Sequence, residues 1–303
     1  MKIKVESFIE ALNNDNPGVE AVTLYQNGSI LLEHRFVPYH ERPIYSHTKS
    51  FAVTLAGIAI DENKLRLDDK LVDFFPEYKS VITDERMYQI ELKHLLTMSS
   101  GLDGRLLVSA GRRTGEGLPD YVAYLLSQTL RHNVGERFLY SNADSHLIAC
   151  MVERAVGEKF QKYAYEKLFS KIDMGYPAWE ATPSGTPFCG SGMYLGINDM
   201  MKIGILYLNN GVWNGEKIVS ADWVRSATKR QILTGASGGW SDSYGYQFWV
   251  IDNPSGVYRA DGAYGQCTII VPDKNAVLAT QSSEYNNTEK FTAMLRKYVF
   301  DVE

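Results

Sequence analysis

The chain has 303 residues, of which 45% are apolar and 22% are charged, and its formal net charge at pH 7 is 31 − 36 = −5. This composition is typical of a folded globular protein and not of a disordered chain. The acidic balance argues against a nucleic-acid partner, because proteins that grip phosphate backbones more often carry a basic surface.

The N-terminus leads into an amphipathic stretch that has neither the uninterrupted apolar core nor the small-residue cleavage site of a signal peptide. The longest apolar run, Leu55–Ile60, is interrupted by Gly57 and falls far short of the roughly 20 residues that a membrane span needs. We therefore expect a cytoplasmic protein without a membrane span, although a leader removed from the sequence would escape this reasoning.

Hydrophobic periodicity and turn signals predict strands near both ends of the chain and helices in the middle. In chain order, the predicted elements are a helix at 3–12, strands at 21–26 and 30–36 joined by Asn27-Gly28, helices at 46–61, 91–98, 118–128, 143–156, 160–169 and 197–208, strands at 246–251, 256–259, 267–271 and 276–281, and a helix at 288–298. This distribution suggests a sheet built from both termini with a helical part inserted between them.

The segment 103–117 contains three arginines and four glycines and is predicted to be an exposed loop. It is either an ordinary solvated loop or a mobile rim over a functional site.

Three cysteines, Cys150, Cys189 and Cys267, are widely separated and form no CxxC pair. Their odd number and spacing suggest neither a disulfide framework nor a zinc site. The sequence also lacks an HExxH helix and a GxxxxGK[ST] loop. We expect reduced cysteines, no metal and no cofactor.

A GxSxG motif at 235–239 matches the nucleophile elbow of α/β-hydrolases. That elbow needs a histidine downstream of the serine, yet all six histidines precede Ser237. The flanking residues also lack strand and helix patterns. We interpret this segment as a glycine-rich loop.

A second serine motif, SxxK, occurs at Ser46–Lys49 and at Ser226–Lys229. Three-residue spacing on a helix places both side chains on one face, where a neutral lysine can accept the serine proton. Ser46 opens a predicted helix with apolar later turns, so its hydroxyl would lie near the backbone N–H groups of the helix start. Ser226 lies in a polar helix end. The alternative for Ser46 is a helix cap followed by a surface lysine.

Tyr140-Ser141-Asn142 stands at the entry of the predicted helix 143–156, whereas the three other Tyr-x-Asn matches do not share this context. A tyrosine hydroxyl beside a lysine can relay a proton to a leaving group. An asparagine amide can hydrogen-bond an acyl group. Ser46, Lys49 and Tyr140 are therefore the candidate catalytic residues.

In their order along the chain, these motifs resemble the serine β-lactamase and penicillin-binding-protein superfamily, in particular the branch of class C β-lactamases, esterases and 6-aminohexanoate-oligomer hydrolases. The resemblance extends from about residue 18 to residue 302. Its further landmarks are Leu67-Asp68-Asp69-Lys70-Leu71-Val72, His94-Leu95-Leu96-Thr97-Met98-Ser99-Ser100-Gly101-Leu102, Gly190-Ser191-Gly192-Met193-Tyr194, Tyr207-Leu208-Asn209-Asn210-Gly211 and Asp261-Gly262-Ala263-Tyr264-Gly265-Gln266.

The resemblance implies an α+β, β-lactamase-like fold, in which an antiparallel sheet from both chain ends is flanked by helices and joined to an inserted helical domain. Residues 1–75 and 185–303 would form the sheet domain and residues 76–184 the helical domain, with the active site between them.

The resemblance also implies roles for individual residues. Ser46 would be the nucleophile, Lys49 its activating partner and Tyr140 a general acid or base. The backbone N–H groups of Ser46 and Ala263 would form the oxyanion hole. The residues expected to contact substrate are Asn142, Asp261, Gly262 and Tyr264.

One departure concerns the edge strand, where many members carry Lys or His before a small residue and Gly. Here the segment is Tyr258-Arg259-Ala260-Asp261-Gly262. Arg259 either supplies the positive charge that a substrate carboxylate needs, or it points away or pairs with an acid. The departure weakens the prediction of a β-lactam or a peptidoglycan stem as substrate.

Three functions are compatible with these residues. The first is a serine hydrolase that acts through an acyl-enzyme on a small ester or amide. The second keeps this mechanism for a β-lactam or a D-alanyl peptide. The third is a non-catalytic binding or regulatory module that has kept the fold. The acyl group, the leaving group and the oligomeric state are not predicted.

Overall fold

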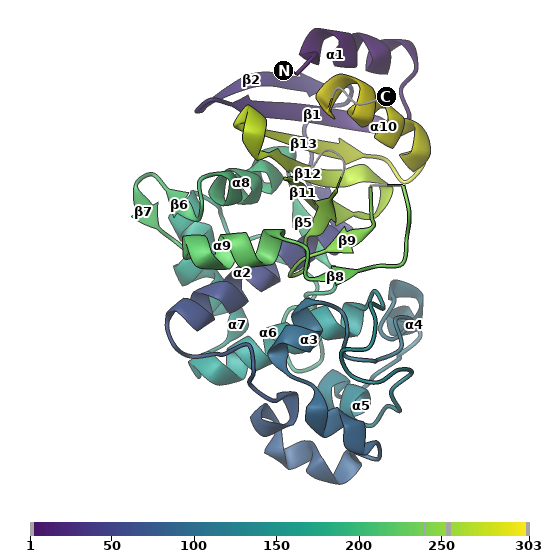
Figure 1. Cartoon of the computed structure of the whole chain (residues 1–303), viewed down its shortest axis with the longest axis vertical. Helices are drawn as coiled ribbons and strands as arrows, with labels where there is room; N and C mark the ends of the chain where they lie inside the picture. The colour runs from purple at the N-terminus through teal and green to yellow at the C-terminus, as the bar shows by residue number, and fades with distance from the viewer. Residues whose placement is uncertain (1–2, 239, 253–255, 301–303) are drawn as a thin grey trace.

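The computed structural model describes residues 3–238, 240–252 and 256–300, so Gly239 of the glycine-rich loop lies outside the described residues. An antiparallel sheet of eight strands, in the order β2-β1-β13-β12-β11-β10-β9-β8, draws on both ends of the chain (Figure 1). Its strands are β1 (Val19–Gln26), β2 (Ser29–Arg35), β8 (Ile232–Leu233), β9 (Ser243–Tyr244), β10 (Trp249–Ile251), β11 (Val257–Gly262), β12 (Gln266–Val271) and β13 (Ala276–Ser282).

The first hairpin forms at the predicted turn. Asn27 and Gly28 have φ angles of 51° and 89°, the left-handed conformations that a two-residue hairpin loop with the right twist requires. Gln26 pairs with Ser29 across this turn, and Leu24 pairs with Leu278 of β13 on the other side of β1. The N-terminal hairpin is therefore joined directly to the C-terminal strands.

Helices cover both faces of this sheet. Because side chains alternate along a strand, Ala276 and Leu278 pack toward the terminal helices, whereas Val277 and Ala279 face the opposite core. The terminal helices are α1 (Val5–Asn14) and α10 (Thr288–Leu295), and α10 continues as a π-helical turn at Arg296–Phe300. The opposite face is covered by α8 (Ile197–Leu208), which packs on β12 and β13.

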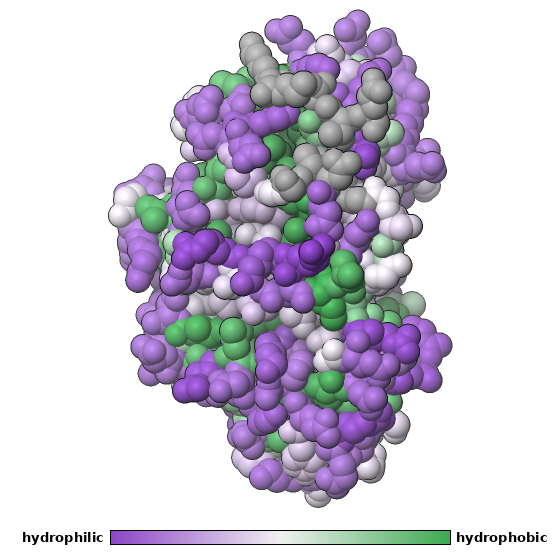
Figure 2. All heavy atoms as spheres, in the orientation of Figure 1, coloured by the Kyte–Doolittle hydropathy of each residue, from purple (hydrophilic) through white to green (hydrophobic). Residues whose placement is uncertain are grey.

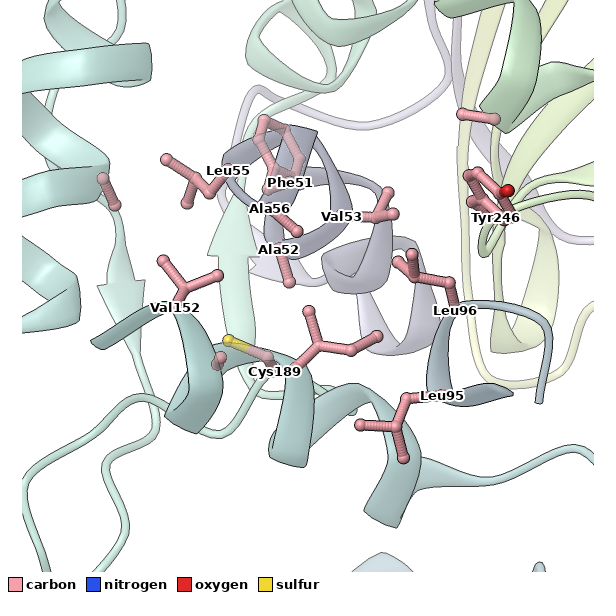
Figure 3. Close-up of a cluster of buried hydrophobic side chains, with 14 of the residues drawn as sticks. Phe51, Ala52, Val53, Leu55, Ala56, Leu95, Leu96, Val152, Cys189 and Tyr246 are labelled. Atoms are coloured by element: carbon pink, nitrogen blue, oxygen red, sulfur yellow. The ribbon is translucent and has the colours of Figure 1, made fainter. Parts of the chain in front are cut away.

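Helix α2 (Thr48–Asp61) is the centre of the second core, because every residue from Thr48 to Ala59 is buried. Figure 3 shows Phe51 and Val53 of this helix among Leu96 and Val152 from neighbouring helices. A helix that is buried on all sides is held by packing around its whole circumference. It is consequently a rigid base for the residues at its N-terminus.

The helical part lies at the other end of the molecule from the terminal helices (Figure 1). Its helices are α3 (Leu92–Leu96), α4 (Ser109–Arg113), α5 (Tyr121–Leu126), α6 (Asn142–Val156) and α7 (Phe160–Ala164), which continues as a π-helical turn (Tyr165–Phe169) and a 3-10 turn (Ser170–Ile172). Three 3-10 turns precede them, at Leu71–Phe74, Pro76–Val81 and Glu85–Gln89. The domain boundaries at 75/76 and 184/185 stay a prediction.

The remaining elements are short. They are β3 (Arg42–Pro43), β4 (Ala178–Trp179) and β5 (Met193–Leu195) in one small sheet, β6 (Val212–Trp213) and β7 (Glu216–Lys217) in another, and α9 (Ala221–Thr228). The face in Figure 2 is mainly hydrophilic, with small separate hydrophobic patches. Within the described ranges, no helix has both the length and the apolar character to cross a bilayer.

Two predicted elements are shorter than expected for local reasons. The helix predicted at 118–128 begins at Tyr121, because the Asp120 side chain accepts hydrogen bonds from the N–H groups of Val122 and Ala123 as an N-cap. The strand predicted at 246–251 begins at Trp249, because Gln247 has a left-handed φ of 58° and the chain turns there to join β9 to β10.

Candidate active site

Ser46 lies in a 3-10 turn (Tyr45–His47) directly before α2, and not in the first turn of the α-helix itself. Tyr45 adopts a left-handed φ of 49°, which is uncommon for a residue with a side chain. Gly262, at the end of β11, packs against this turn, and a Cβ atom there would collide with the carbonyl oxygen of Ile44. The close approach of β11 to Ser46 therefore depends on a glycine.

Lys49 lies one helical turn after Ser46 and is only 1% exposed. Its Nζ donates hydrogen bonds to Ser46 Oγ at 3.0 Å, to Asn142 Oδ1 at 2.8 Å and to the carbonyl oxygen of Gly190. Burial, reinforced by the positive charge of Arg112, lowers the pKa of Lys49 to about 7. A substantial fraction of Lys49 is therefore neutral near neutral pH.

The three partners of Lys49 suit a neutral amine. The carbonyl of Gly190 only accepts hydrogen bonds, and Asn142 presents its amide oxygen. Protonated Lys49 donates to all three partners, including Ser46 Oγ. Once neutral, it can use its two N–H bonds for Asn142 and Gly190 and accept the Ser46 hydroxyl proton with its lone pair. The arrangement is thus suited to removing the Ser46 proton.

Tyr140 lies at the entry of α6, with its ring stacked on Trp249 at a centroid distance of 5.8 Å and an interplanar angle of 12°. Lys49 Nζ is 4.9 Å from the centre of the Tyr140 ring. Burial raises the pKa of Tyr140 above its usual value, and interaction with the Ser46 side chain offsets part of this rise. The phenol therefore keeps its proton at neutral pH and is able to donate it.

Asn142 is held by the cap of α6, because Ser141 Oγ accepts the N–H of Asp144. A Cβ atom at Gly190 would be 2.8 Å from both Cβ and the carbonyl oxygen of Asn142, so these two segments also pack closely. Asn142 thus contacts Lys49, and it is not among the described residues that line the adjoining pocket.

A pocket of about 320 Å³ opens beside Ser46 and Tyr140. Four predicted site residues line it, namely Asp261 and Gly262 at the end of β11 and Ala263 and Tyr264 in the 3-10 turn that follows (Ala263–Gly265). Seven further lining residues were not predicted from the sequence. Gly265 lies in a landmark segment but was given no role, and no motif marks the other six, which are Trp240, Trp249, Cys267, Thr288, Phe291 and Thr292. They are brought together by the sheet and by α10.

Arg259 does not line this pocket. It is 1% exposed, its Nε donates to Asp261 Oδ2 at 3.0 Å, and its guanidinium lies 4.1 Å from the ring centre of Trp240. Of the two alternatives for Arg259, pairing with an acid is the one observed. Among the described lining residues, Asp261 is the one charged side chain.

The competing serine motifs lie elsewhere. Ser226 is in α9, and Lys229 is an exposed residue just beyond the end of that helix. Ser237 lies in the loop between β8 and β9, without a flanking strand–helix elbow. Neither serine is among the described residues of the pocket lining.

The segment 103–117 is partly anchored near the site. Arg112, in α4, pairs with Glu180 at 2.8 Å, donates to the carbonyl of Leu107 and lies 3.7 Å from the ring centre of Phe188. Its side chain is 5% exposed. Phe188 is two residues before Gly190, so this loop packs on the segment that binds Lys49 and is not simply solvated.

The cysteines and the other titratable groups form no metal site in the described part of the chain, where no group of three or more His, Cys, Asp or Glu side chains is arranged to hold an ion. Cys150, Cys189 and Cys267 are all buried free thiols.

Several curated proteins have related sequences, including the two described next. The 6-aminohexanoate-dimer hydrolase of Paenarthrobacter ureafaciens is 25% identical over 283 residues, which cover 87% of this chain and 72% of that protein. Protein flp of Staphylococcus aureus (strain N315) is 25% identical over 150 residues, which cover 48% of this chain and 29% of that protein.

Many solved structures share the fold, including the two described next. A protein from Bacillus anthracis, provisionally named a 6-aminohexanoate-dimer hydrolase, has a TM-score of 0.80 at 19% identity, over 97% of this chain and 80% of that chain. EstCE1, described as a hydrolase with promiscuous acyltransferase activity, has a TM-score of 0.77 at 17% identity, over 98% and 97% of the two chains. The β-lactamase-like α+β fold that the sequence predicts is thereby confirmed.

The match to a family model is more extensive than either curated relationship. The Beta-lactamase family model covers residues 5–299, a span that includes the Ser46 turn, α6 and the end of β11. This chain therefore belongs to the Beta-lactamase family, whose members include serine hydrolases of the β-lactamase and penicillin-binding-protein type.

Proposed function

We propose that this protein is a serine hydrolase that forms an acyl-enzyme on Ser46 with a small ester or amide. The observation that carries the proposal is the contact between the buried Lys49 Nζ and Ser46 Oγ at 3.0 Å, in a site that lowers the lysine pKa to about 7. A buried lysine with a lowered pKa is a means of activating a serine nucleophile.

In the proposed acylation, neutral Lys49 takes the hydroxyl proton of Ser46 as Oγ bonds to the substrate carbonyl carbon. The N–H groups of Ser46 and Ala263 stabilise the oxyanion. When the tetrahedral intermediate collapses, Tyr140 protonates the leaving oxygen or nitrogen, and the proton held by Lys49 restores the Tyr140 hydroxyl.

Deacylation repeats these steps with water. A water molecule transfers a proton to neutral Lys49 as the water oxygen bonds to the acyl carbon. Collapse of the second intermediate breaks the bond to Ser46 Oγ, which recovers its proton from Lys49. The acid is released, and the three side chains return to their starting protonation states.

The charge of the pocket favours substrates without a carboxylate near the reacting carbonyl. Arg259 is engaged by Asp261 and enclosed by Trp240, so no cation is available in the described lining to bind a carboxylate. We expect p-nitrophenyl valerate to react faster than mono-p-nitrophenyl glutarate, which has the same carbon count but ends in a carboxylate. Equal or reversed rates would contradict this part of the proposal.

A β-lactam or a D-alanyl peptide is the second candidate, and membership of the Beta-lactamase family favours it. Both substrates present a carboxylate, however, and the paired state of Arg259 argues against them. Hydrolysis of nitrocefin, or stable acylation of Ser46 by labelled penicillin, would shift the assignment to this candidate.

The first test is labelling with a fluorophosphonate probe, followed by mass spectrometry of the modified peptide. The proposal expects labelling at Ser46, loss of labelling in Ser46→Ala, and unchanged labelling in Ser226→Ala, which removes the serine of the second SxxK motif. A folded wild-type protein that does not react would support a non-catalytic relative instead.

A further inference from the structure

A buried carboxyl group lies beside the catalytic cluster without touching the pocket. Asp144, in the first turn of α6, is 0% exposed. Its Oδ1 accepts hydrogen bonds from Ser100 Oγ at 2.7 Å and Ser141 Oγ at 3.0 Å. Its Oδ2 is also buried and has no hydrogen-bond partner among the described residues. Such an unsatisfied buried oxygen is destabilising, so it calls for a physical explanation.

The hydrogen bonds of Asp144 hold the chain segment that carries two site residues. Ser141, which Asp144 binds through both its side chain and its backbone N–H, stands between Tyr140 and Asn142. Ser100 ties the same carboxyl to the segment after α3. The turn that presents Tyr140 and Asn142 is therefore fixed by side chains that are not among the described residues lining the pocket.

The charges around this carboxyl come from several elements. The positive charge of Lys49, in α2, favours the ionised form of Asp144. The negative charge of Asp144 in turn contributes to raising the pKa of Tyr244, in β9. Lys49 itself faces Arg112 of α4 and the Cys189 thiol in addition to Asp144. Arg112 thus lowers the pKa of Lys49, and Asp144 acts in the opposite direction.

Both members of the pair titrate in the same range. Burial raises the pKa of Asp144 to about 7, although the hydroxyls of Ser100 and Ser141 and the charge of Lys49 act in the opposite direction. Burial and Arg112 lower the pKa of Lys49 to about 7. Two coupled groups of this kind share protons, so the state of one depends on the state of the other.

We propose that Asp144 is a positioning residue, which fixes the Tyr140–Asn142 turn through Ser141 and Ser100. It also places a negative charge two residues after Asn142, a hydrogen-bond partner of Lys49, and this charge favours the protonated form of Lys49. The inference rests on the proposed function for the role of Ser46. Its electrostatic core, the coupling of Asp144 to Lys49, is measurable without any turnover.

The test is the variant Asp144→Asn. The amide oxygen keeps an acceptor for Ser100 and Ser141, whereas the negative charge is lost. We expect the titration midpoint of Lys49, followed by NMR of protein with ¹³C-labelled lysine, to fall by about one pH unit. The Lys49 signal is identified by its loss in Lys49→Met.

Two control variants separate this effect from simple destabilisation. Asp84→Asn removes another capping carboxyl, which binds Arg86 and the N–H of Leu130 and is not among the groups that face Lys49. It should leave the Lys49 midpoint unchanged. Arg112→Gln removes the opposing positive charge and should raise the midpoint.

An unchanged Lys49 midpoint in a folded Asp144→Asn protein would overturn the inference. If this variant does not fold, ¹³C-aspartate NMR of the wild-type protein decides: ionisation of Asp144 at or below the pH range of the Lys49 titration supports the inference, and an Asp144 that stays protonated throughout overturns it.

The pH profile of fluorophosphonate labelling distinguishes this inference from the proposed function. A Lys49 midpoint that shifts in Asp144→Asn, together with no labelling of Ser46 in any protein, would reject the hydrolase and keep the coupling. Efficient labelling with the same pH profile in both proteins would keep the hydrolase and reject the coupling.

Discussion

The two SxxK motifs of this chain have the same spacing and different surroundings. Lys49 is almost completely buried and donates to three acceptors from three segments, including Ser46 itself. Lys229 is exposed, has extended backbone angles just beyond α9, and lies outside the helix that contains Ser226. The comparison teaches that the motif supplies a hydroxyl and an amine at both places, whereas only the tertiary structure buries one lysine against its serine.

The largest expected effect comes from removing each lysine. Lys49→Met should reduce the rate of Ser46 acylation by a fluorophosphonate by about 10⁴-fold, because the serine loses its proton acceptor. Lys229→Met should react at the wild-type rate. The comparison would fail if the two variants had similar second-order labelling rates.

The helices that carry the motifs should differ in their contribution to stability. Phe51 of α2 is fully buried, and Phe51→Ala should lower the free energy of unfolding by about 4 kcal/mol. Arg225 of α9 is exposed, and Arg225→Ala should change the free energy of unfolding by less than about 0.5 kcal/mol. Urea denaturation of both variants measures the difference. A loss of less than about 1 kcal/mol in Phe51→Ala would show that α2 is not the rigid base inferred for the site.

A smaller effect is expected at Tyr140. Tyr140→Phe should lower kcat about 100-fold for an alkyl ester, whose leaving group needs a proton. It should have much less effect on a p-nitrophenyl ester, because p-nitrophenolate leaves without protonation. The exposed Tyr285 provides a control in Tyr285→Phe. An equal loss on both esters would assign Tyr140 to positioning and not to proton donation.

The smallest kinetic effect is a shift in the pH dependence of the acylation rate. Since the neutral form of Lys49 is the base, acylation should rise with pH through about 7, the value to which burial lowers the Lys49 pKa. Arg112→Gln should move this rise to higher pH by a fraction of a unit, because it removes the charge that opposes the protonated lysine. A rate independent of pH between 5 and 9 would contradict a lysine base.

Stability should depend on pH through Asp144. Its folded-state pKa of about 7 lies above the value of 3.8 for a free carboxyl, so the folded state binds more protons between these values. The contribution of Asp144 to the free energy of unfolding is therefore fully present below about pH 4. It is lost as the pH rises toward 7, by up to about 1.4 kcal/mol per pH unit. Asp144→Asn should lack this contribution to the slope in denaturation measured from pH 4 to 7.

Local features of the sequence accounted for much of the fold. Asn27-Gly28 specified a two-residue hairpin, and alternating apolar residues identified the strands at both ends. The π-helical turn at Tyr165–Phe169 and the left-handed Gln247 that delays the start of β10 were not predictable in this way, because apolar periodicity specifies neither the hydrogen-bond pattern within a helix nor the backbone angle of a single residue. Ser46 was expected to open the helix, but it lies in the 3-10 turn before the helix, against which Gly262 packs.

The sequence by itself determined which residues have the chemistry of a serine hydrolase, because hydroxyl, amine and phenol groups occur in ordered motifs that short spacing rules identify. Only the tertiary structure decided which SxxK lysine is buried, that Arg259 is engaged by Asp261, and that a buried Asp144 binds Ser100 and Ser141 beside the Tyr140–Asn142 turn. The physical reason is that the pKa and hydrogen bonding of a group depend on desolvation and on neighbouring charges, and these are contributed by segments far away in the chain.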